Sequence, residues 1–298
     1  MKTLLFGAFG CAAVFGCQAG ALGPEAANGI IAVSSRVSKD YVRARLADGS
    51  FVPETYAFGE GGNWGTEVKD ATFEKLKFID VARVIAGPLA SRKYTATRNA
   101  GTTRLLIMVY WGTTRVPPPY GNDPMYQNYR HAIDEYNILM ADGAVDAAVS
   151  VYNAGLLQLN IENGIRDRMD YRNAKLLGYD GEDYGNVATD YGRMISHSAL
   201  GEDQRDETGE IEDNRYFVVL LAYDFQAVWK QKRHTLLWET RFSINERHNA
   251  FDQALPVMAK MASRFFGQPT NGLVRDRVGD GRVEVGTPTV IEFLSGKK

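Results

Sequence analysis

The arrangement of hydrophobic and polar positions divides the chain into strand-like and helix-like segments. Three segments with β-branched and aromatic residues are typical of short strands: 30–37, 41–46 and 53–58. The apolar run 104–111 is short and bounded by glycines, which predicts a strand buried on both faces. Apolar residues alternate along 216–229 and again along 236–244, with a basic turn at 230–233 between them. These two runs predict an antiparallel hairpin held by cross-strand pairs.

Apolar positions spaced by three and four residues mark one helix before the 104–111 strand and another near the end of the chain. The first spans 72–87, and Pro88 ends or kinks it because the proline ring clashes with the carbonyl four residues earlier. The second follows Asn249, a candidate N-cap, and ends at Gly267. Its expected buried face consists of Phe251, Leu255, Met258, Ala262 and Phe265.

The segment 123–178 has a helical pattern throughout, with two interruptions. Asp123 is a suitable N-cap, and the proline that follows it fits the first turn of a helix. We expect a first helix up to the Asp142-Gly143 turn, a second over 144–161 and a third over 165–177, with Asn163-Gly164 separating the last two.

Together these elements predict an α+β fold: a mixed or antiparallel sheet with packed helices and a helical insertion at 123–178. A single domain is expected over 30–268. Within it, residues 179–214 are acidic and poorly periodic, which is typical of a solvated loop. Residues 269–298 are predicted to be a C-terminal tail, in which 289–294 has the pattern of one further strand.

The N-terminus has the pattern of an export signal. A single basic residue, Lys2, precedes 13 uncharged residues from Leu4 to Gly16. This stretch is too short to span a bilayer as a helix, which needs about 20 residues, but it suits the apolar core of a secretory leader. We therefore expect residues 1–17 to be a signal peptide.

Two cleavage sites fit this leader. The residues Val14-Phe15-Gly16-Cys17 resemble the lipobox of bacterial lipoproteins, whose cysteine is lipidated and becomes the new N-terminus, although Phe15 is larger than is usual there. The alternative is ordinary cleavage after Ala19 or Ala21. We favour Cys17 as the lipid attachment site and expect residues 18–29, which are small and polar, to form a tether.

Composition narrows the classes of function. The chain has 298 residues, 45% of them hydrophobic, and a formal net charge of −2. A nucleic-acid partner is not expected, because binding to phosphates needs a basic surplus or stripe. Both cysteines, Cys11 and Cys17, lie in the predicted leader, so we expect no internal disulfide, cysteine-ligated metal or cysteine nucleophile in the mature chain.

The sequence contains no recognised catalytic or metal-binding motif. The histidines at 131, 197, 234 and 248 form no close pair on an expected element. A Gly-x-Ser-x-Gly elbow and a His-Glu-x-x-His motif are absent, and the acidic stretch 180–213 does not match the calcium-loop template. We therefore assign no catalytic residue, no metal site and no cofactor.

Tryptophans provide the remaining candidates for a binding site. Trp64 is expected to lie in a Gly-rich loop at 59–65, where an exposed aromatic side chain is a candidate ligand-binding residue. A phosphate-binding role for this loop is disfavoured because its spacing matches neither the dinucleotide fingerprint nor the P-loop. Trp111, Trp229 and Trp238 lie on expected strands and are predicted to pack in the core.

The order of elements resembles a broad, uncharacterised group of bacterial envelope lipoproteins with a small α/β domain. The closest local matches are the strand Thr55-Tyr56-Ala57-Phe58 and the hairpin that carries Trp229 and Leu236-Leu237-Trp238. The domain looks like that of the TolB amino-terminal half, the curli secretion lipoprotein and the lipoprotein activators of peptidoglycan synthases. Segment 123–178 departs from that compact pattern. The resemblance implies a role in binding or assembly and carries over no functional residue.

We therefore expect an exported, lipid-anchored protein of the periplasm or outer membrane, with an envelope protein or a cell-wall component as its partner and the membrane reached through its lipid. Two alternatives stay open. The first is a soluble periplasmic hydrolase that uses carboxylates of the 180–213 loop. The second is an oligomerising structural envelope protein that uses the 123–178 helices, with Tyr126, Tyr129 and Tyr136 exposed in the monomer.

Overall fold

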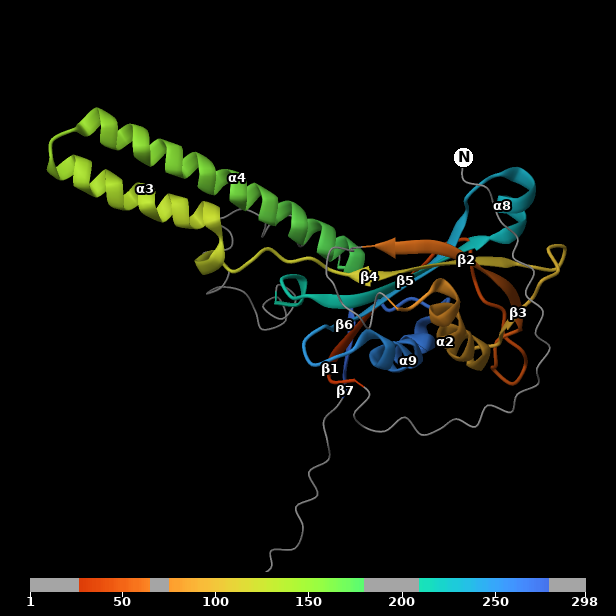
Figure 1. Cartoon of the computed structure of the whole chain (residues 1–298). Helices are drawn as coiled ribbons and strands as arrows, with labels where there is room; N and C mark the ends of the chain where they lie inside the picture. Colours follow the sequence, from red (N-terminus) through yellow and green to blue (C-terminus); the bar gives the residue numbers. More distant parts are fainter. Residues whose placement is uncertain (1–26, 65–74, 180–208, 279–298) are drawn as a thin grey trace, which may run out of the picture.

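The computed structural model describes residues 27–64, 75–179 and 209–278 as a sheet with packed helices and a long helical hairpin (Figure 1). The strands are β1 (Gly29–Val37), β2 (Glu54–Trp64), β3 (Tyr94–Ala96), β4 (Leu105–Thr113), β5 (Arg215–Asp224), β6 (Leu236–Asn245) and β7 (Val274–Val278). The helices are α2 (Phe78–Ser91), α3 (Pro124–Ala141), α4 (Val145–Leu177), α8 (Phe225–Gln231) and α9 (Phe251–Ala262), with short 3-10 turns at Tyr120–Asn122 and Ser263–Phe265. The predicted α+β class is confirmed.

Seven strands of the described chain form one sheet in the order β3-β2-β4-β5-β6-β1-β7. β2 is parallel to β3 and to β4, and α2 provides the crossover from β2 to β3. All pairs from β4 to β7 are antiparallel. The sheet is therefore mixed, and the chain leaves it for α3 and α4 between two neighbouring strands, β4 and β5.

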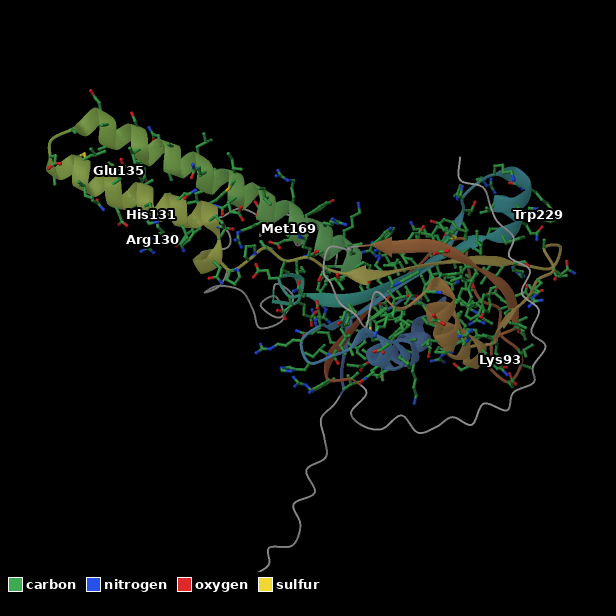
Figure 2. The ribbon with its side chains drawn as sticks, viewed as in Figure 1. Lys93, Arg130, His131, Glu135, Met169 and Trp229 are labelled. Carbon is green, nitrogen blue, oxygen red and sulfur yellow. The ribbon has the colours of Figure 1, made fainter. Side chains whose placement is uncertain are left out.

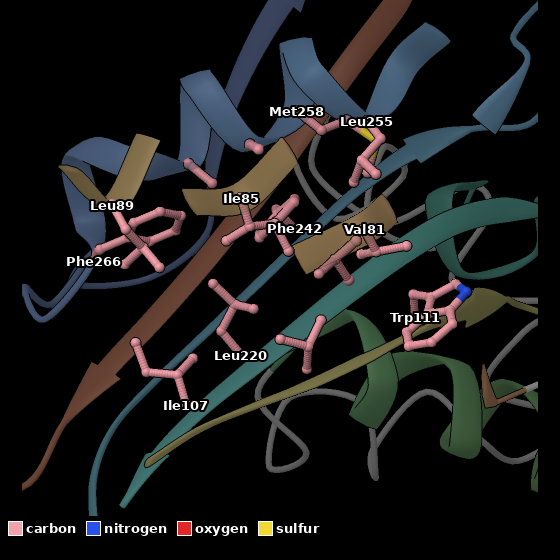
Figure 3. Close-up of a cluster of buried hydrophobic side chains, with 14 of the residues drawn as sticks. Val81, Ile85, Leu89, Ile107, Trp111, Leu220, Phe242, Leu255, Met258 and Phe266 are labelled. Atoms are coloured by element: carbon pink, nitrogen blue, oxygen red, sulfur yellow. The ribbon is translucent and has the colours of Figure 1, made fainter. Parts of the chain in front are cut away.

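One face of the sheet is covered by α2 and α9, which bury their apolar sides against β4, β5 and β6 (Figure 3). The helices contribute Val81, Ile85, Leu89, Leu255 and Met258, and the strands contribute Ile107, Leu220 and Phe242. Each of these apolar side chains contributes about 1.5–3 kcal/mol by leaving water. This layer is the main hydrophobic core, and Trp111 and Trp238 lie in it as predicted.

The opposite face is covered in part by the end of α4. Leu177 packs with Phe217 and Val219 of β5 in a second, smaller apolar cluster. The guanidinium of Arg241 donates to the carbonyl oxygens of Lys175 and Leu176, at 2.9 and 3.3 Å, and so satisfies carbonyls that a helix end leaves unpaired. These contacts fix the root of the helical hairpin on the sheet.

Three helix-boundary predictions were wrong. α9 ends at Ala262 and a 3-10 turn follows it, so the helix does not reach the predicted end at Gly267. α2 begins at Phe78 and continues through Pro88 to Ser91, because the burial of Leu89 offsets the single backbone hydrogen bond that the proline removes. Asn249 is not the N-cap of α9, since its side chain instead exchanges hydrogen bonds with the backbone of Asn28. This exchange places the last residues of the expected 18–29 tether inside the domain.

The alternation along 216–229 spans two elements rather than one strand. β5 ends at Asp224, whose carboxylate accepts a hydrogen bond from the backbone N–H of Ala227 and caps α8. Within α8 the rings of Phe225 and Trp229 lie 6.1 Å apart, as neighbours four residues apart on a helix. Trp229 is 42% exposed and does not belong to the core, which corrects its prediction (Figure 2).

The segment 41–46 is not a strand. A single bridge, between Arg45 and Phe51, joins its end to the residues beyond a turn at 48–50. Tyr41 points inward and donates to the buried carboxylate of Glu54 at 2.5 Å, whereas Val42 is exposed. The alternation of apolar and polar residues in this segment therefore reflects an irregular stretch of chain that lies over the edge of the core.

The expected C-terminal tail contains β7, which the sequence pattern did not reveal. Val274 to Val278 pair with β1 through backbone hydrogen bonds, and three of these five residues are charged. A strand at the edge of a sheet needs no buried face, so it leaves no apolar alternation to detect. The predicted strand at 289–294 lies outside the described residues.

The two later helices of the insertion are one continuous helix, α4, through Asn163 and Gly164. A glycine inside a helix costs about 1 kcal/mol, which an ion pair and the buried contacts around it outweigh. Glu162 and Arg166 form that pair across the predicted break, with Nε and Oε1 2.9 Å apart. The helix ends at Gly178 in the left-handed conformation (φ 91°), as predicted.

Candidate functional site

The α3–α4 hairpin stands out from the sheet domain (Figure 1). α4 has 33 residues and α3 has 18, lengths of about 50 and 27 Å at 1.5 Å per residue. α3 packs beside the first half of α4, from the Asp142-Gly143 turn to the level of Glu162. The second half of α4 continues toward the sheet, and it is there that the hairpin is anchored.

The two helices meet along a narrow seam of small and aromatic side chains. A Cβ atom placed on Gly155 would lie 2.6 Å from the Cβ of Ala132, so the glycine is required for this close approach. Tyr129 also lies against Gly155, and the rings of Tyr136 and Tyr152 lie 5.4 Å apart. The tyrosines of α3 are therefore half-buried in the seam rather than fully exposed.

Buried polar side chains in the second half of α4 bind a backbone segment. Residues 114–119, which lead from β4 toward α3, form no helix or strand, so their carbonyl groups need other partners. Asn173 donates from Nδ2 to the carbonyl oxygen of Arg115 at 2.8 Å. Arg166 donates from Nη2 to that of Pro118 at 2.7 Å. This explains why polar residues occupy the buried side of a helix here.

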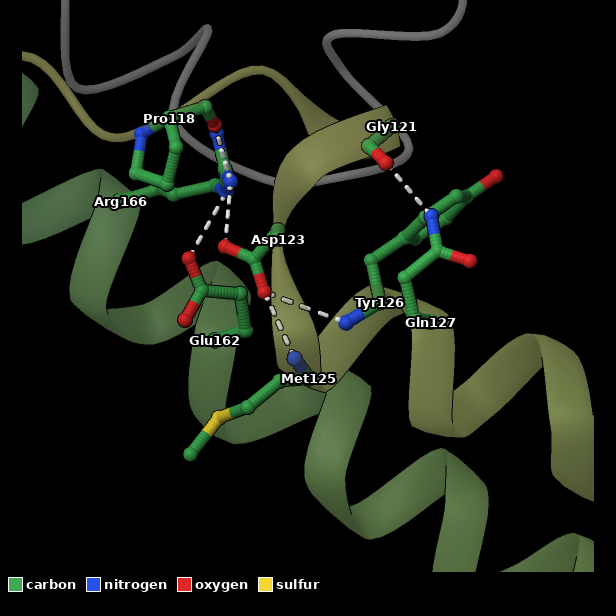
Figure 4. A network of polar contacts seen from close by, with 8 residues as sticks. All are labelled: Pro118, Gly121, Asp123, Met125, Tyr126, Gln127, Glu162 and Arg166. Carbon is green, nitrogen blue, oxygen red and sulfur yellow. Dashed lines mark hydrogen bonds and ion pairs between the residues drawn. The ribbon is translucent and has the colours of Figure 1, made fainter.

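A charged network closes the base of the hairpin (Figure 4). Asp123 caps α3 as predicted, its Oδ1 accepting from the backbone N–H groups of Met125 and Tyr126 at 2.8 and 3.2 Å. Its Oδ2 lies 2.7 Å from Nη2 of Arg166 on α4. Glu162 pairs with the same guanidinium. One arginine thus joins the start of α3 to the middle of α4.

Two carboxyl groups share this one buried guanidinium, and their pKa values move apart. Burial raises the pKa of Glu162, and the neighbouring Asp123 raises it further. Burial also acts to raise the pKa of Asp123, but hydrogen bonds from Glu162, Arg166 and the helix N-terminus hold it below its usual value. The pKa of Asp123 is therefore lowered and that of Glu162 raised, so Glu162 takes up a proton at a higher pH than Asp123 does.

The outer surfaces of the two helices differ in character. The exposed side of α3 carries charged and polar residues, among them Arg130, His131 and Glu135 (Figure 2), beside Ile138, which is 63% exposed. Residues 147–161 of α4 contain no charged residue, although Leu157 is 62% and Ile161 is 48% exposed. An apolar surface on a projecting helix is unusual in a monomeric protein and typically marks an interaction site.

Trp64 does not lie in an exposed loop. β2 extends through the Gly-rich stretch to Trp64, whose half-buried ring lies 4.2 Å from that of Tyr110 on β4. Met108 and Tyr110 lean across Gly59 and Gly61, where any side chain would overlap them. The glycines therefore serve close packing between neighbouring strands, which overturns the loop prediction and removes the argument for Trp64 as an exposed binding residue.

The other candidate residues are not brought together. His131, His234 and His248 are exposed at separate places, and His197 lies outside the described residues. Among described residues, no group of three histidines, cysteines or carboxylates is placed to hold a metal ion. Cys17 and most of the 180–213 carboxylates also lie outside the described ranges. Sequence reasoning missed Glu162 and Arg166, whose i, i+4 spacing was the available signal.

Comparisons with known proteins add little. No protein-family model matches this chain, and no curated protein is significantly similar to it. Among solved structures it is similar to a PDZ domain protein from Parabacteroides distasonis ATCC 8503, with a TM-score of 0.36 and 11% identity. The match covers 83% of this chain and 39% of that one. A similarity this loose supports no inference about fold or function.

Among the described residues, no helix is both long enough and apolar enough to cross a lipid bilayer.

Proposed function

We propose that this is an exported, lipid-anchored protein of the bacterial cell envelope that binds or assembles with an envelope protein or a cell-wall component. The location rests on the uncharged Leu4–Gly16 stretch and on Cys17, which follows it in a lipobox-like sequence. The resemblance of the element order to envelope lipoproteins of the TolB amino-terminal and curli secretion type favours the same location.

The observation that carries the binding role is the projecting hairpin with its exposed apolar side. A helix pair that stands away from the core contributes little burial to the sheet domain. It nevertheless has a buried ionic network at its base that fixes its direction. Rigid support beneath exposed apolar residues such as Leu157 and Ile161 suits a surface that meets a partner.

Catalysis is the weaker proposal because two of the three described acidic residues of the 180–213 segment serve structural contacts. Glu210 pairs with Arg275 at 3.1 Å and accepts a hydrogen bond from the Tyr179 hydroxyl. Asp213 accepts one from the amide of Asn245 at 2.9 Å. We assign no catalytic residue and no cofactor.

Metabolic labelling with a fatty-acid analogue tests the anchor. The wild-type chain should take up label, Cys17→Ala should not, and Cys11→Ala is the matched control because it alters the other leader cysteine and should still be labelled. An unlabelled wild type, or label retained by Cys17→Ala, would refute lipid attachment at this residue.

Photo-cross-linking in the intact envelope tests the binding role. A photoreactive amino acid placed at Leu157 should give a discrete adduct, whereas one at Ile138, which is 63% exposed on α3, should not. The absence of an adduct at 157, or equal yields at both positions, would contradict a binding role for the α4 surface.

A further inference from the structure

A regular stripe of small and aliphatic residues runs along α4: Ala147, Ser150, Ala154, Leu157 and Ile161. Their spacing of three and four residues keeps them on one side of a helix. Successive residues of a helix are rotated by about 100°, so Gly155 and Tyr152, which face α3, point away from this side of α4. All five side chains of the stripe are exposed. We call this surface the α4 stripe.

The α4 stripe is uncharged in its middle and charged with opposite signs at its two ends. No charged residue occurs from 147 to 161. Asp142 and Asp146 lie at the tip of the hairpin, and Arg168 and Arg172 lie beyond Ile161 on the stripe's side of α4; all four are exposed. A partner must therefore be apolar at its centre, with basic groups at one end and acidic groups at the other.

We propose that the α4 stripe binds the same stripe of a second copy, with the two helices antiparallel about a two-fold axis at Ala154. This inference rests on the proposed binding role of the hairpin and names its partner. In an antiparallel pair, the acidic tip of each hairpin lies near Arg168 and Arg172 of the other copy, whereas a parallel pair would place like charges together. Charge complementarity therefore selects the antiparallel arrangement.

Side-chain size supports the same register. About an axis at Ala154, position 161 of one copy faces 147 of the other, and position 157 faces 151, next to Ser150. Ile161 thus meets the small Ala147 of the partner, and Leu157 meets Val151 beside the small Ser150. Ala154, at the crossing point, allows the helices to approach closely. Large side chains facing small ones are what interdigitated helix packing requires.

The contact is small, which sets its expected strength. From 147 to 161 the stripe is about 21 Å long, and a helix is about 10 Å wide, so each copy buries about 210 Å², roughly a quarter of the ~800 Å² typical of a stable interface. The free protein should therefore form a weak, concentration-dependent dimer. Attachment to a membrane surface raises the effective concentration and favours the dimer there.

Sedimentation velocity on the full-length chain, with Cys11 and Cys17 replaced by serine, tests the dimer without any lipid. The wild-type stripe should show reversible self-association as the concentration rises. Ile161→Glu should weaken it by about ten- to a hundredfold, since it removes a buried side chain and adds a charge to the uncharged face. Ile138→Glu is the matched control on α3 and should leave association unchanged.

Single cysteines in the same background test the orientation. Ala154→Cys should cross-link between copies with a short bismaleimide, because the two positions meet at the axis. Ile161→Cys should not, since its copies lie about 21 Å apart in the antiparallel dimer. Cross-linking at both positions would show a parallel pair and overturn the proposal.

Other results separate this inference from the proposed function. A wild type that stays monomeric at all concentrations, or an equal effect of Ile161→Glu and Ile138→Glu, would also overturn the dimer. Neither result bears on fatty-acid labelling at Cys17. A photo-adduct at Leu157 with a different protein would support the binding role and refute self-association.

Discussion

Removing the Asp123 side chain should loosen the base of the hairpin by an amount that follows from its contacts. Asp123→Ala deletes two N-cap hydrogen bonds, worth about 1 kcal/mol. It also deletes the Arg166 ion pair, and breaking a buried pair costs up to 3–5 kcal/mol when the remaining charge is left unpaired. Here Glu162 also pairs with the guanidinium, so Arg166 keeps one carboxylate partner. We therefore expect a total cost of about 2–3 kcal/mol.

Asp123→Asn separates the two contributions. Asparagine caps a helix as well as aspartate does, so this variant should lose only the ionic part, about 1–2 kcal/mol. Asp80→Ala is a matched control, because Asp80 is also in the first turn of a helix, but its pair with Arg83 is exposed. That variant should cost well under 1 kcal/mol.

Amide hydrogen exchange is the suitable assay, since the hairpin can open without unfolding the sheet. In Asp123→Ala, amides of α3 should exchange about 30- to 150-fold faster than in the wild type, while amides of β4 and β5 stay protected. The reasoning would be refuted if Asp123→Asn cost as much as Asp123→Ala, or if neither accelerated exchange in α3 more than Asp80→Ala does.

Two further predictions concern stability and pH. Gly112→Ala should destabilise the sheet strongly, because its methyl group would overlap the carbonyl oxygen of Trp64. Gly87→Ala is the control: this glycine is exposed in α2, and the substitution should stabilise the protein by about 0.5–1 kcal/mol. Urea unfolding measures the stability of both variants, and equal effects would contradict the contact at Gly112. Burial raises the pKa of Glu162 in the folded state. The neutral carboxyl therefore stabilises the folded state fully below the pKa of unfolded glutamate, about 4.3. This stabilisation is lost as the pH rises through the pKa of folded Glu162. Glu162→Gln stays neutral, so its Tm relative to wild type should rise between pH 4 and pH 8, and a constant difference would refute the raised pKa of Glu162.

Local signals in the sequence were sufficient where one short-range interaction decides the structure. Asp123 followed by proline predicted the start of α3, and Gly178 predicted the end of α4. The apolar runs at 104–111 and 236–244 predicted β4 and β6 because their inward side chains are the core itself. In each case the residues that carry the pattern also make the stabilising contact.

Predictions failed where distant parts of the chain decide between local alternatives. The pattern at 216–229 allowed a strand throughout, but the cap at Asp224 and the packing of Phe225 turned its end into a helix. The glycines of β2 suggested a loop because nothing in the sequence shows that Met108 and Tyr110 occupy the space beside them.

The sequence by itself determined the α+β class and the position of the helical insertion, and its N-terminal pattern with Cys17 motivates the proposed location. Tertiary structure alone decided that the insertion is a projecting hairpin, that Asp123, Glu162 and Arg166 meet at its base, and that the described part of the chain leaves one side of α4 uncovered. The physical reason is that periodicity records which side of an element avoids water. It does not record which neighbour covers that side, or whether the neighbour belongs to the same chain.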